Sequence, residues 1–272
     1  MTHRIALTLE YQGQAYHGWQ RQSGDLPTIQ AQVEYAVTKI AQQPLSVICA
    51  GRTDTGVHAL HQVIHFDTST DRPIENWLRG VDFYLPHDIS VTHAVKISSD
   101  FHARFSAVDR TYHYIIDRSP TPPAIMHNLV TWLAGDFDTN LMQQASQKLL
   151  GEHDFSSFQG RSCQAKSPYR EVLVAEWYER GPYLIFRIKA NAFLHHMVRY
   201  LVGALVEVGR YQCSLDWFEQ LLCQPDRQNR KFKLPAQGLY LTRVAYPQSF
   251  DTLLQSKYPV GQRLLPGLIN IE

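Results

Sequence analysis

The 272-residue sequence predicts an α+β protein made of two halves that repeat one pattern of strands and helices. Short segments alternate apolar and polar residues, which is typical of half-buried strands. Longer segments repeat apolar residues every three or four positions, which is typical of amphipathic helices. In the first half these segments follow the order strand, helix, strand, strand, helix, strand, the split βαβ pattern of ferredoxin-like domains.

Each element of the first half is indicated by its apolar residues. The expected elements are a strand at 5–11, a helix at 27–41, strands at 46–50 and 62–66, a helix at 73–85 and a strand at 89–97. Proline is favoured in the first turn of a helix, so Pro27 marks the start of the first one. The two short strands are rich in β-branched residues and are bounded by glycine and polar residues.

The second half repeats the theme. The expected elements are a strand at 110–117, a helix at 141–150, strands at 171–179 and 183–190, a helix at 195–208 and a strand at 239–246. Residues 180–182 (Arg-Gly-Pro) predict a hairpin turn between the two middle strands. The boundary between the halves is expected within 101–108, which gives an N-terminal domain over 1–105 and a C-terminal domain over 106–272.

Composition is compatible with real cores and an anionic partner. The chain is 44% hydrophobic and 19% charged, which is typical of globular domains. The net charge is only +1, but residues 161–243 hold 13 Lys and Arg against 7 Asp and Glu. A local basic excess favours a partner such as nucleic acid, although ordinary solvated surface gives the same count.

The cysteines argue against a metal ribbon and against a disulfide framework. The four cysteines are Cys49, Cys163, Cys213 and Cys223, and no two of them form a C-x-x-C pair. Cys49 lies in an apolar segment and is interpreted as a small buried hydrophobe. There is no apolar signal segment at the start and no run of about 18 uncharged apolar residues, so a cytoplasmic protein is expected.

The most informative segment is the polar stretch Gly51 to His58 (GRTDTGVH), which lies between two strand-like runs. Glycines bracket Arg52 and Asp54, so the backbone can turn sharply and let another molecule approach closely. A carboxylate on such a loop can serve as a nucleophile. The simpler interpretation is a glycine-bracketed turn whose Asp bonds to nearby backbone N–H groups.

This stretch is one of four motifs that together resemble those of the tRNA pseudouridine synthase A (TruA) family. The others, in the family's order, are Arg110 to Tyr114 (RTYHY), Asn191 to Arg199 (NAFLHHMVR) and Gly238 to Leu241 (GLYL). The opening Tyr11 to Gln22 also fits. The resemblance implies the pseudouridine synthase fold, in which two α/β halves form a central antiparallel sheet with the active-site cleft between them.

The resemblance also implies a function. The protein is expected to isomerise uridine to pseudouridine at positions 38 to 40 of the tRNA anticodon stem-loop. No cofactor and no metal are expected, because the reaction moves a glycosidic bond without redox change. The expected partners are tRNA and a second copy of the chain in a homodimer, with no membrane and no small-molecule cosubstrate.

The resemblance places three catalytic residues. Asp54 falls on the family's nucleophile, although the sequence leaves open whether it attacks C1′, attacks C6 of the base or abstracts a ribose proton. Arg199 falls on the arginine that pairs with this carboxylate; an adjacent cation keeps a buried carboxylate ionised. Otherwise, an arginine on an apolar helix extends to solvent. Tyr112 falls on the active-site tyrosine that stacks on the flipped base or transfers a proton.

Two further residues are expected to contact the substrate. Arg52 is expected to fill the gap that the target base leaves in the stack, or to bind the phosphate of that nucleotide. Leu239 falls on an apolar residue that would pack under the uracil, although an ordinary core leucine fits the same pattern. Tyr114 shares a strand face with Tyr112, and we expect it to lie in the core.

Two other classes of function compete with the enzyme. The histidines His58, His61, His65, His195 and His196 offer ligands for a metal-dependent RNA hydrolase, but the H-E-x-x-H helix signature is absent. Ferredoxin-like repeats also bind RNA with no chemistry at all. Asp54 discriminates, because a carboxylate at the centre of an RNA-binding face repels phosphate.

Overall fold

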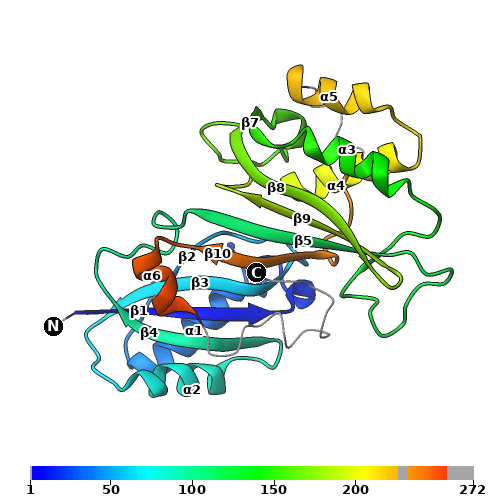
Figure 1. Ribbon diagram of the computed structural model, residues 1–272. Coiled ribbons are helices and arrows are strands. Elements are labelled where there is room, and N and C mark those ends of the chain that lie inside the picture. Colours follow the sequence, from blue (N-terminus) through cyan, green and yellow to red (C-terminus); the bar gives the residue numbers. More distant parts are fainter. Residues whose placement is uncertain (1, 226–231, 256–272) are drawn as a thin grey trace. The chain divides into compact units, whose positions relative to one another are not determined.

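The computed structural model describes residues 2–225 and 232–255, which group into two compact units (Figure 1). The first unit is Met1–Val108 together with the chain from Tyr240 onward, and the second unit is Asp109–Leu239. The last strand therefore groups with the first unit, whereas the sequence pattern placed it in a second domain over 106–272. Each unit contains both strands and helices, as expected for an α+β protein.

The first unit has the ferredoxin-like arrangement that the sequence predicts. Its elements are β1 (His3–Tyr11), η1 (Gly13–Ala15), α1 (Ile29–Ala41), β2 (Ile48–Cys49), β3 (His58–Thr68), α2 (Ile74–Tyr84), β4 (Ile89–Ile97), β10 (Leu239–Ala245) and α6 (Gln248–Leu254). Strand β1 lies between β4 and β3 and is antiparallel to both. Strand β2 is antiparallel to β3, so the order is β4-β1-β3-β2.

Strand β3 has two different neighbours along its length. Its later part pairs with β2, with Ile48 opposite His65. Its first residues pair in parallel with β10, with Tyr240 opposite His58. The Ala50 N–H still donates to the Val63 carbonyl of β3 at 2.8 Å, and the chain leaves the sheet after this residue. Residues 50–57 are here called the Asp54 loop.

The second unit repeats the order strand, helix, strand, strand, helix, with the additional short strands β6 (Thr131–Trp132) and β7 (Gly151–Asp154). Its other elements are β5 (Asp109–Asp117), α3 (Thr139–Gln147), η2 (Ser156–Phe158), β8 (Tyr169–Arg180), β9 (Tyr183–Ala190), α4 (Met197–Gly209) and α5 (Leu215–Cys223). Strands β5, β9, β8 and β7 form an antiparallel sheet in that order, and β6 pairs in parallel with the end of β5. Helix α3 packs against α4, α5 and β8.

Local chemistry explains where the helices start. The side chains of Thr28, Asp138 and Ser214 accept hydrogen bonds from backbone N–H groups in the first turns of α1, α3 and α5. The expected helix at 195–208 begins at Met197 instead, because His196 has a left-handed backbone with φ of 64°. Within residues 2–225 and 232–255, no helix is both long and apolar enough to cross a bilayer.

Candidate active site

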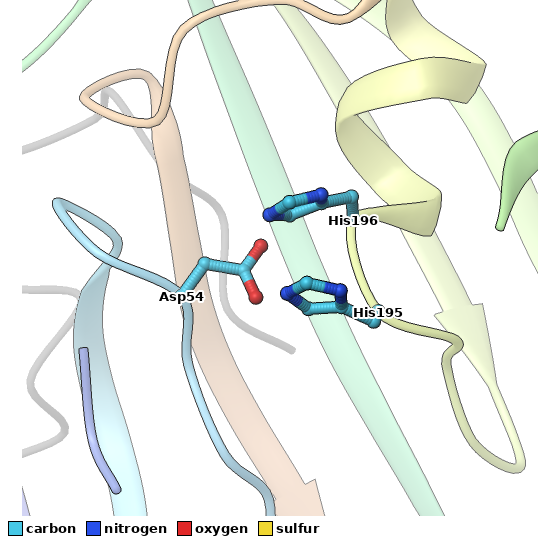
Figure 2. Close-up of side chains that lie close together, drawn as sticks. All are labelled: Asp54, His195 and His196. Atoms are coloured by element: carbon cyan, nitrogen blue, oxygen red, sulfur yellow. The ribbon is translucent and has the colours of Figure 1, made fainter. Parts of the chain in front are cut away.

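Asp54 projects from the loop between β2 and β3 (Figure 2) and is half-buried. Neighbouring residues hold this loop by hydrogen bonds. The Thr53 carbonyl accepts a hydrogen bond of 3.0 Å from the Trp19 N–H, and its hydroxyl shares one of 2.9 Å with the Tyr11 hydroxyl. The Gln62 amide donates to the Gly51 carbonyl at 2.6 Å. These hydrogen bonds hold the residues just before Asp54 in place and so restrict the backbone from which its side chain projects.

Two glycines of the opening motif let the chain pass close to the Asp54 loop. A Cβ atom at Gly13 would lie 2.0 Å from the Val57 carbonyl oxygen. A Cβ atom at Gly18 would lie 2.7 Å from the Thr53 carbonyl oxygen, and Gly18 has a φ of 83° that favours glycine. The segment from Tyr11 to Trp19 therefore serves as the support of the Asp54 loop, a role that sequence reasoning missed.

Arg52 is exposed on the same loop, two residues before Asp54. It lies close enough to Cys49 to act on the thiol electrostatically. Burial raises the pKa of Cys49 to about 12, while Arg52 and Arg104 act in the opposite direction. The thiol is therefore protonated at neutral pH, in agreement with its interpretation as a small hydrophobe. The substrate contact of Arg52 stays a prediction.

Tyr112 and Tyr114 lie on one face of β5 and have different surroundings. Tyr112 is 8% exposed, and its ring meets Phe193 edge to face with 5.0 Å between the ring centroids. Tyr114 is fully buried and donates to the Pro235 carbonyl at 2.8 Å. Burial raises the pKa of the Tyr114 hydroxyl above its usual range. Tyr114 is therefore a core residue, as predicted, and Phe193 is a neighbour of Tyr112 that the sequence pattern did not single out.

Arg199 is half-buried on α4 and holds a distant segment of the second unit. Its Nε donates to the Leu234 carbonyl at 2.8 Å, and its own carbonyl accepts from the Leu234 N–H at 3.2 Å. One turn later, a Cβ atom at Gly203 would lie 1.5 Å from the Phe232 carbonyl oxygen. The guanidinium is thus positioned by the protein and is not a loosely solvated side chain.

Leu239 is 4% exposed at the start of β10. Gly238 before it accepts a hydrogen bond of 2.8 Å from the Ile115 N–H. A Cβ atom at Gly238 would lie 2.7 Å from the Thr131 hydroxyl. The glycine of the last motif therefore serves close packing against β5 and β6, while the contact of Leu239 with a base stays a prediction.

The two histidines of the third motif precede α4, and their rings stack with 3.7 Å between centroids (Figure 2). The His195 carbonyl accepts a hydrogen bond of 2.9 Å from the Gly160 N–H. Burial lowers the pKa of His196 to about 3, and His195, Arg199 and Lys233 add to this effect. His196 is therefore neutral at physiological pH.

The other three histidines of the competing metal-hydrolase interpretation accept hydrogen bonds from the backbone. Nδ1 of His58, His61 and His65 accepts from the N–H of Gly13 at 3.2 Å, of Val244 at 3.3 Å and of Ala103 at 3.1 Å, respectively. Within the described chain, none of the three belongs to a group of three side chains close enough to hold one ion. Their role in this unit is to support backbone segments.

Comparisons with known proteins agree with the sequence motifs. Residues 8–106 and 145–247 match the family model described as tRNA pseudouridine synthase. The "tRNA pseudouridine synthase A" of Legionella pneumophila (strain Paris) is 45% identical over 257 residues, covering 94% of this chain and 98% of the relative. The chain belongs to the tRNA pseudouridine synthase A family.

Further relatives of this family cover almost the whole chain. The "tRNA pseudouridine synthase A" of Pseudomonas aeruginosa is 44% identical over 268 residues, covering 98% of this chain and 93% of the relative. A solved structure, described as an H/ACA RNP bound to a substrate RNA containing 2'-deoxyuridine, aligns at a TM-score of 0.36 and 14% identity. That alignment covers 74% of this chain and 44% of the other, and at this similarity it adds no weight to the sequence matches.

Proposed function

We propose that the protein isomerises uridine to pseudouridine in tRNA, at positions 38 to 40 of the anticodon stem-loop, with Asp54 as the nucleophile. The observation that carries the proposal is the half-buried Asp54 on a loop that backbone and side-chain hydrogen bonds immobilise. That loop lies inside the part of the chain that matches the family model.

The chemistry asks for one carboxylate and no electron carrier. The N1–C1′ bond breaks, the base rotates, C5 bonds to C1′, the C5 proton is lost and N1 gains a proton. A carboxylate that attacks covalently divides one difficult step into two easier ones, as in retaining glycosidases. Attack on C1′, attack on C6 and removal of a ribose proton all use Asp54 in its ionised form.

The remaining roles follow from the chemistry and the family resemblance. Arg199 is assigned as the cation that keeps Asp54 ionised, and its tie to Leu234 restricts the guanidinium to a small range of positions. Tyr112 is assigned to stack on the base or to move a proton, and Phe193 fixes the orientation of its ring. Leu239 is assigned to the face of the uracil.

A base inside the anticodon stem has to leave the stack before Asp54 can reach it. This step costs a few kcal/mol, and the exposed Arg52 is assigned to the vacated space or to the adjoining phosphate. The proposal also includes a homodimer, a cytoplasmic location and a reaction without a cofactor, all of which come from the family resemblance.

The test is to incubate the purified protein with a tRNA transcript that carries tritium at C5 of uridine. Tritium release, followed by mapping of the modified positions, is expected at 38 to 40 in the wild type. The Asp54→Asn variant is expected to bind tRNA and release nothing. Tritium release within about tenfold of wild type by this variant would exclude Asp54 as the nucleophile.

The same assay separates the proposal from its competitors. A metal-dependent hydrolase would cleave the transcript and lose activity in millimolar EDTA, and zinc would restore it. An RNA-binding protein without chemistry would bind the transcript and release no tritium in any variant. The isomerase is expected to keep its rate in EDTA once the tRNA has been folded, because magnesium also folds tRNA.

A further inference from the structure

The segment 101–108 of the first unit presents an aromatic ring and a cation to solvent. Phe105 is 76% exposed, and the Arg104 guanidinium lies over its ring at 5.6 Å from the centroid. The His102 ring stacks on Phe105 with 4.3 Å between centroids and an angle of 26° between the planes. A single exposed phenylalanine is common on protein surfaces, so exposure alone does not mark a site. Phe105 is distinguished by the guanidinium and the imidazole that are ordered against its ring.

Hydrogen bonds within the segment make it rigid. Nδ1 of His102 accepts from the N–H groups of both Arg104 and Phe105, at 3.2 and 3.1 Å. The His102 N–H donates to the Ser106 hydroxyl, and the Ser106 N–H donates back to the His102 carbonyl, both at 2.9 Å. The turn is thus formed before any ligand binds, which lowers the entropy cost of recognition.

Hydrogen bonds and ring contacts attach this turn to the core of the first unit. The Ala103 N–H donates to Nδ1 of the buried His65, and the Ala103 carbonyl accepts from the Tyr246 hydroxyl at 2.7 Å. Phe101 is fully buried, with 5.0 Å between its ring centroid and that of Tyr246. Ala103 and Phe101 therefore point inward, while Arg104 and Phe105 are left at the surface.

The turn lies near the start of the Asp54 loop. His65 pairs across the sheet with Ile48 of β2, and its ring is 4.9 Å from that of His102. Arg104 and Arg52 both lie close enough to the Cys49 thiol to act on it electrostatically. Because Cys49 is the last residue of β2, the exposed aromatic ring and two arginines occupy one region of the first unit, around the strand that leads to Asp54.

We propose that Arg104 and Phe105 form a stacking platform for an unpaired nucleotide of the tRNA substrate. This inference rests on the proposed function and names an additional contact surface for its substrate. Aromatic rings and guanidinium planes are the groups on which proteins stack unpaired bases, and the guanidinium also attracts the phosphate. A purely apolar protein partner is a poorer match, because it would take the Arg104 guanidinium out of water and supply no negative charge, whereas a nucleotide supplies a phosphate.

The test compares tRNA binding by the full-length protein and single variants. Phe105→Ala is expected to weaken binding about 5- to 150-fold, the range for loss of one base–aromatic stack. Phe105→Tyr is expected to restore binding, because a stacking ring is retained. Arg104→Gln is expected to weaken binding several-fold and to reduce the dependence of log K on log salt by about one ion.

Matched controls come from α2 of the same unit. Phe83 is 80% exposed and Arg79 is also exposed, so Phe83→Ala and Arg79→Gln remove similar side chains from another surface. Both controls are expected to bind tRNA like wild type. Thermal melting of every variant separates loss of binding from loss of folding.

Three outcomes would contradict the stacking platform. The first is tRNA binding by Phe105→Ala within about twofold of wild type, and the second is an equal loss of tRNA binding in Phe83→Ala. The third is a weakened homodimer in Phe105→Ala with unchanged tRNA affinity per subunit. Because binding is measured without turnover, the comparison also works in an Asp54→Asn background. If the wild type released no tritium but still needed Phe105 to bind tRNA, the proposed isomerase activity would be refuted and the proposed stacking platform would stand.

Discussion

The two units share the order strand, helix, strand, strand, helix, but they connect their middle strands differently. In the first unit, β2 and β3 are joined by the eight residues of the Asp54 loop, 50–57. In the second unit, β8 and β9 are joined by Gly181 and Pro182 alone. The same scaffold therefore carries a candidate nucleophile in one copy and a plain hairpin turn in the other.

The difference comes from how long the middle strands stay paired. Strand β9 pairs with β8 from Tyr183 to Ala190, which leaves no room for a loop. Strand β2 pairs with only two residues of β3, and the start of β3 pairs with β10 instead. Because β10 pairs with the start of β3, the connection between β2 and β3 does not have to pair there and can carry polar residues. Functional residues often lie on such loops of a rigid scaffold.

The largest effect on activity is expected when one residue in each of these two connections is replaced. Asp54→Asn should reduce tritium release from tRNA to background, because the amide keeps the shape and removes the nucleophile. Gly181→Asn, at the matching turn of the second unit, should leave activity unchanged, because asparagine tolerates the φ of 55° found there. Equal loss of activity in both variants would show that the loops matter only for folding.

The next effect compares two arginines of the second unit that both donate to a backbone carbonyl. Arg199 binds the Leu234 carbonyl, and Arg210, which follows α4, binds the Ala134 carbonyl. Arg199→Met should slow turnover about 10²- to 5 × 10³-fold, since loss of a charge partner typically costs about 3–5 kcal/mol. The rate should recover in part at higher pH, because an unpaired Asp54 would have a raised pKa.

Arg210→Met is the control for the lost hydrogen bond. It should turn over tRNA at close to the wild-type rate, and Arg199→Lys should recover part of the activity because the charge is retained. If Arg199→Met kept the wild-type rate and pH profile, the active site would depend on Asp54 and Tyr112 alone.

A smaller effect compares two glycines with positive φ. Gly18→Ala should lower the free energy of unfolding by about 2–4 kcal/mol, because strain is added to a clash with the Thr53 backbone. Gly181→Ala should cost about 1 kcal/mol, because its Cβ would meet open space. Urea unfolding measures both, and equal costs would mean that the close approach to the Asp54 loop is relieved elsewhere.

The last comparison concerns acid stability, which should change in the same direction in both units. Burial lowers the pKa of His65 in the first unit to about 4 and that of His113 in the second to about 3. An unfolded histidine titrates at about 6.5, so below that pH the unfolded chain binds a proton that the folded chain does not. The free energy of unfolding should therefore fall as the pH drops from 6.5 towards 4.

A histidine substitution isolates this effect. His65→Asn keeps a hydrogen-bond acceptor without a titrating ring, so it should reduce the slope by about 1.4 kcal/mol per pH unit. A slope that is the same in the His65→Asn variant and in the wild type would mean that the folded protein binds a proton at His65 as readily as the unfolded chain does.

Elements with a strong pattern could be predicted from the sequence. The strands Ile89–Ile97 and Tyr183–Ala190 have the predicted bounds, because their alternation of apolar residues is marked. Helix α5 was missed, although Ser214 caps it and Leu215, Phe218 and Leu222 are spaced as on one helix face. Strand β2 is shorter than expected because pairing, not propensity, decides where a strand ends.

The site was predictable only as far as its motifs reached. They singled out Asp54, Arg199 and Tyr112, whose positions depend on local segments. The supports of these residues come from distant positions, such as Gly18 for the Asp54 loop and Leu234 for Arg199. A local pattern of apolar residues gives no information on contacts between segments so far apart in the sequence. The supporting contacts could therefore be identified only in the structure.

The parallel pairing of β10 with β3 has a consequence for biosynthesis. Tyr240 lies opposite His58, so two residues separated by most of the chain complete one sheet. Contacts of such high sequence separation form slowly, because a long loop has to close first. During synthesis, the whole of the second unit therefore leaves the ribosome before the last strand of the first unit does. The unit that bears Asp54 is the first to be synthesised and the last to complete its sheet.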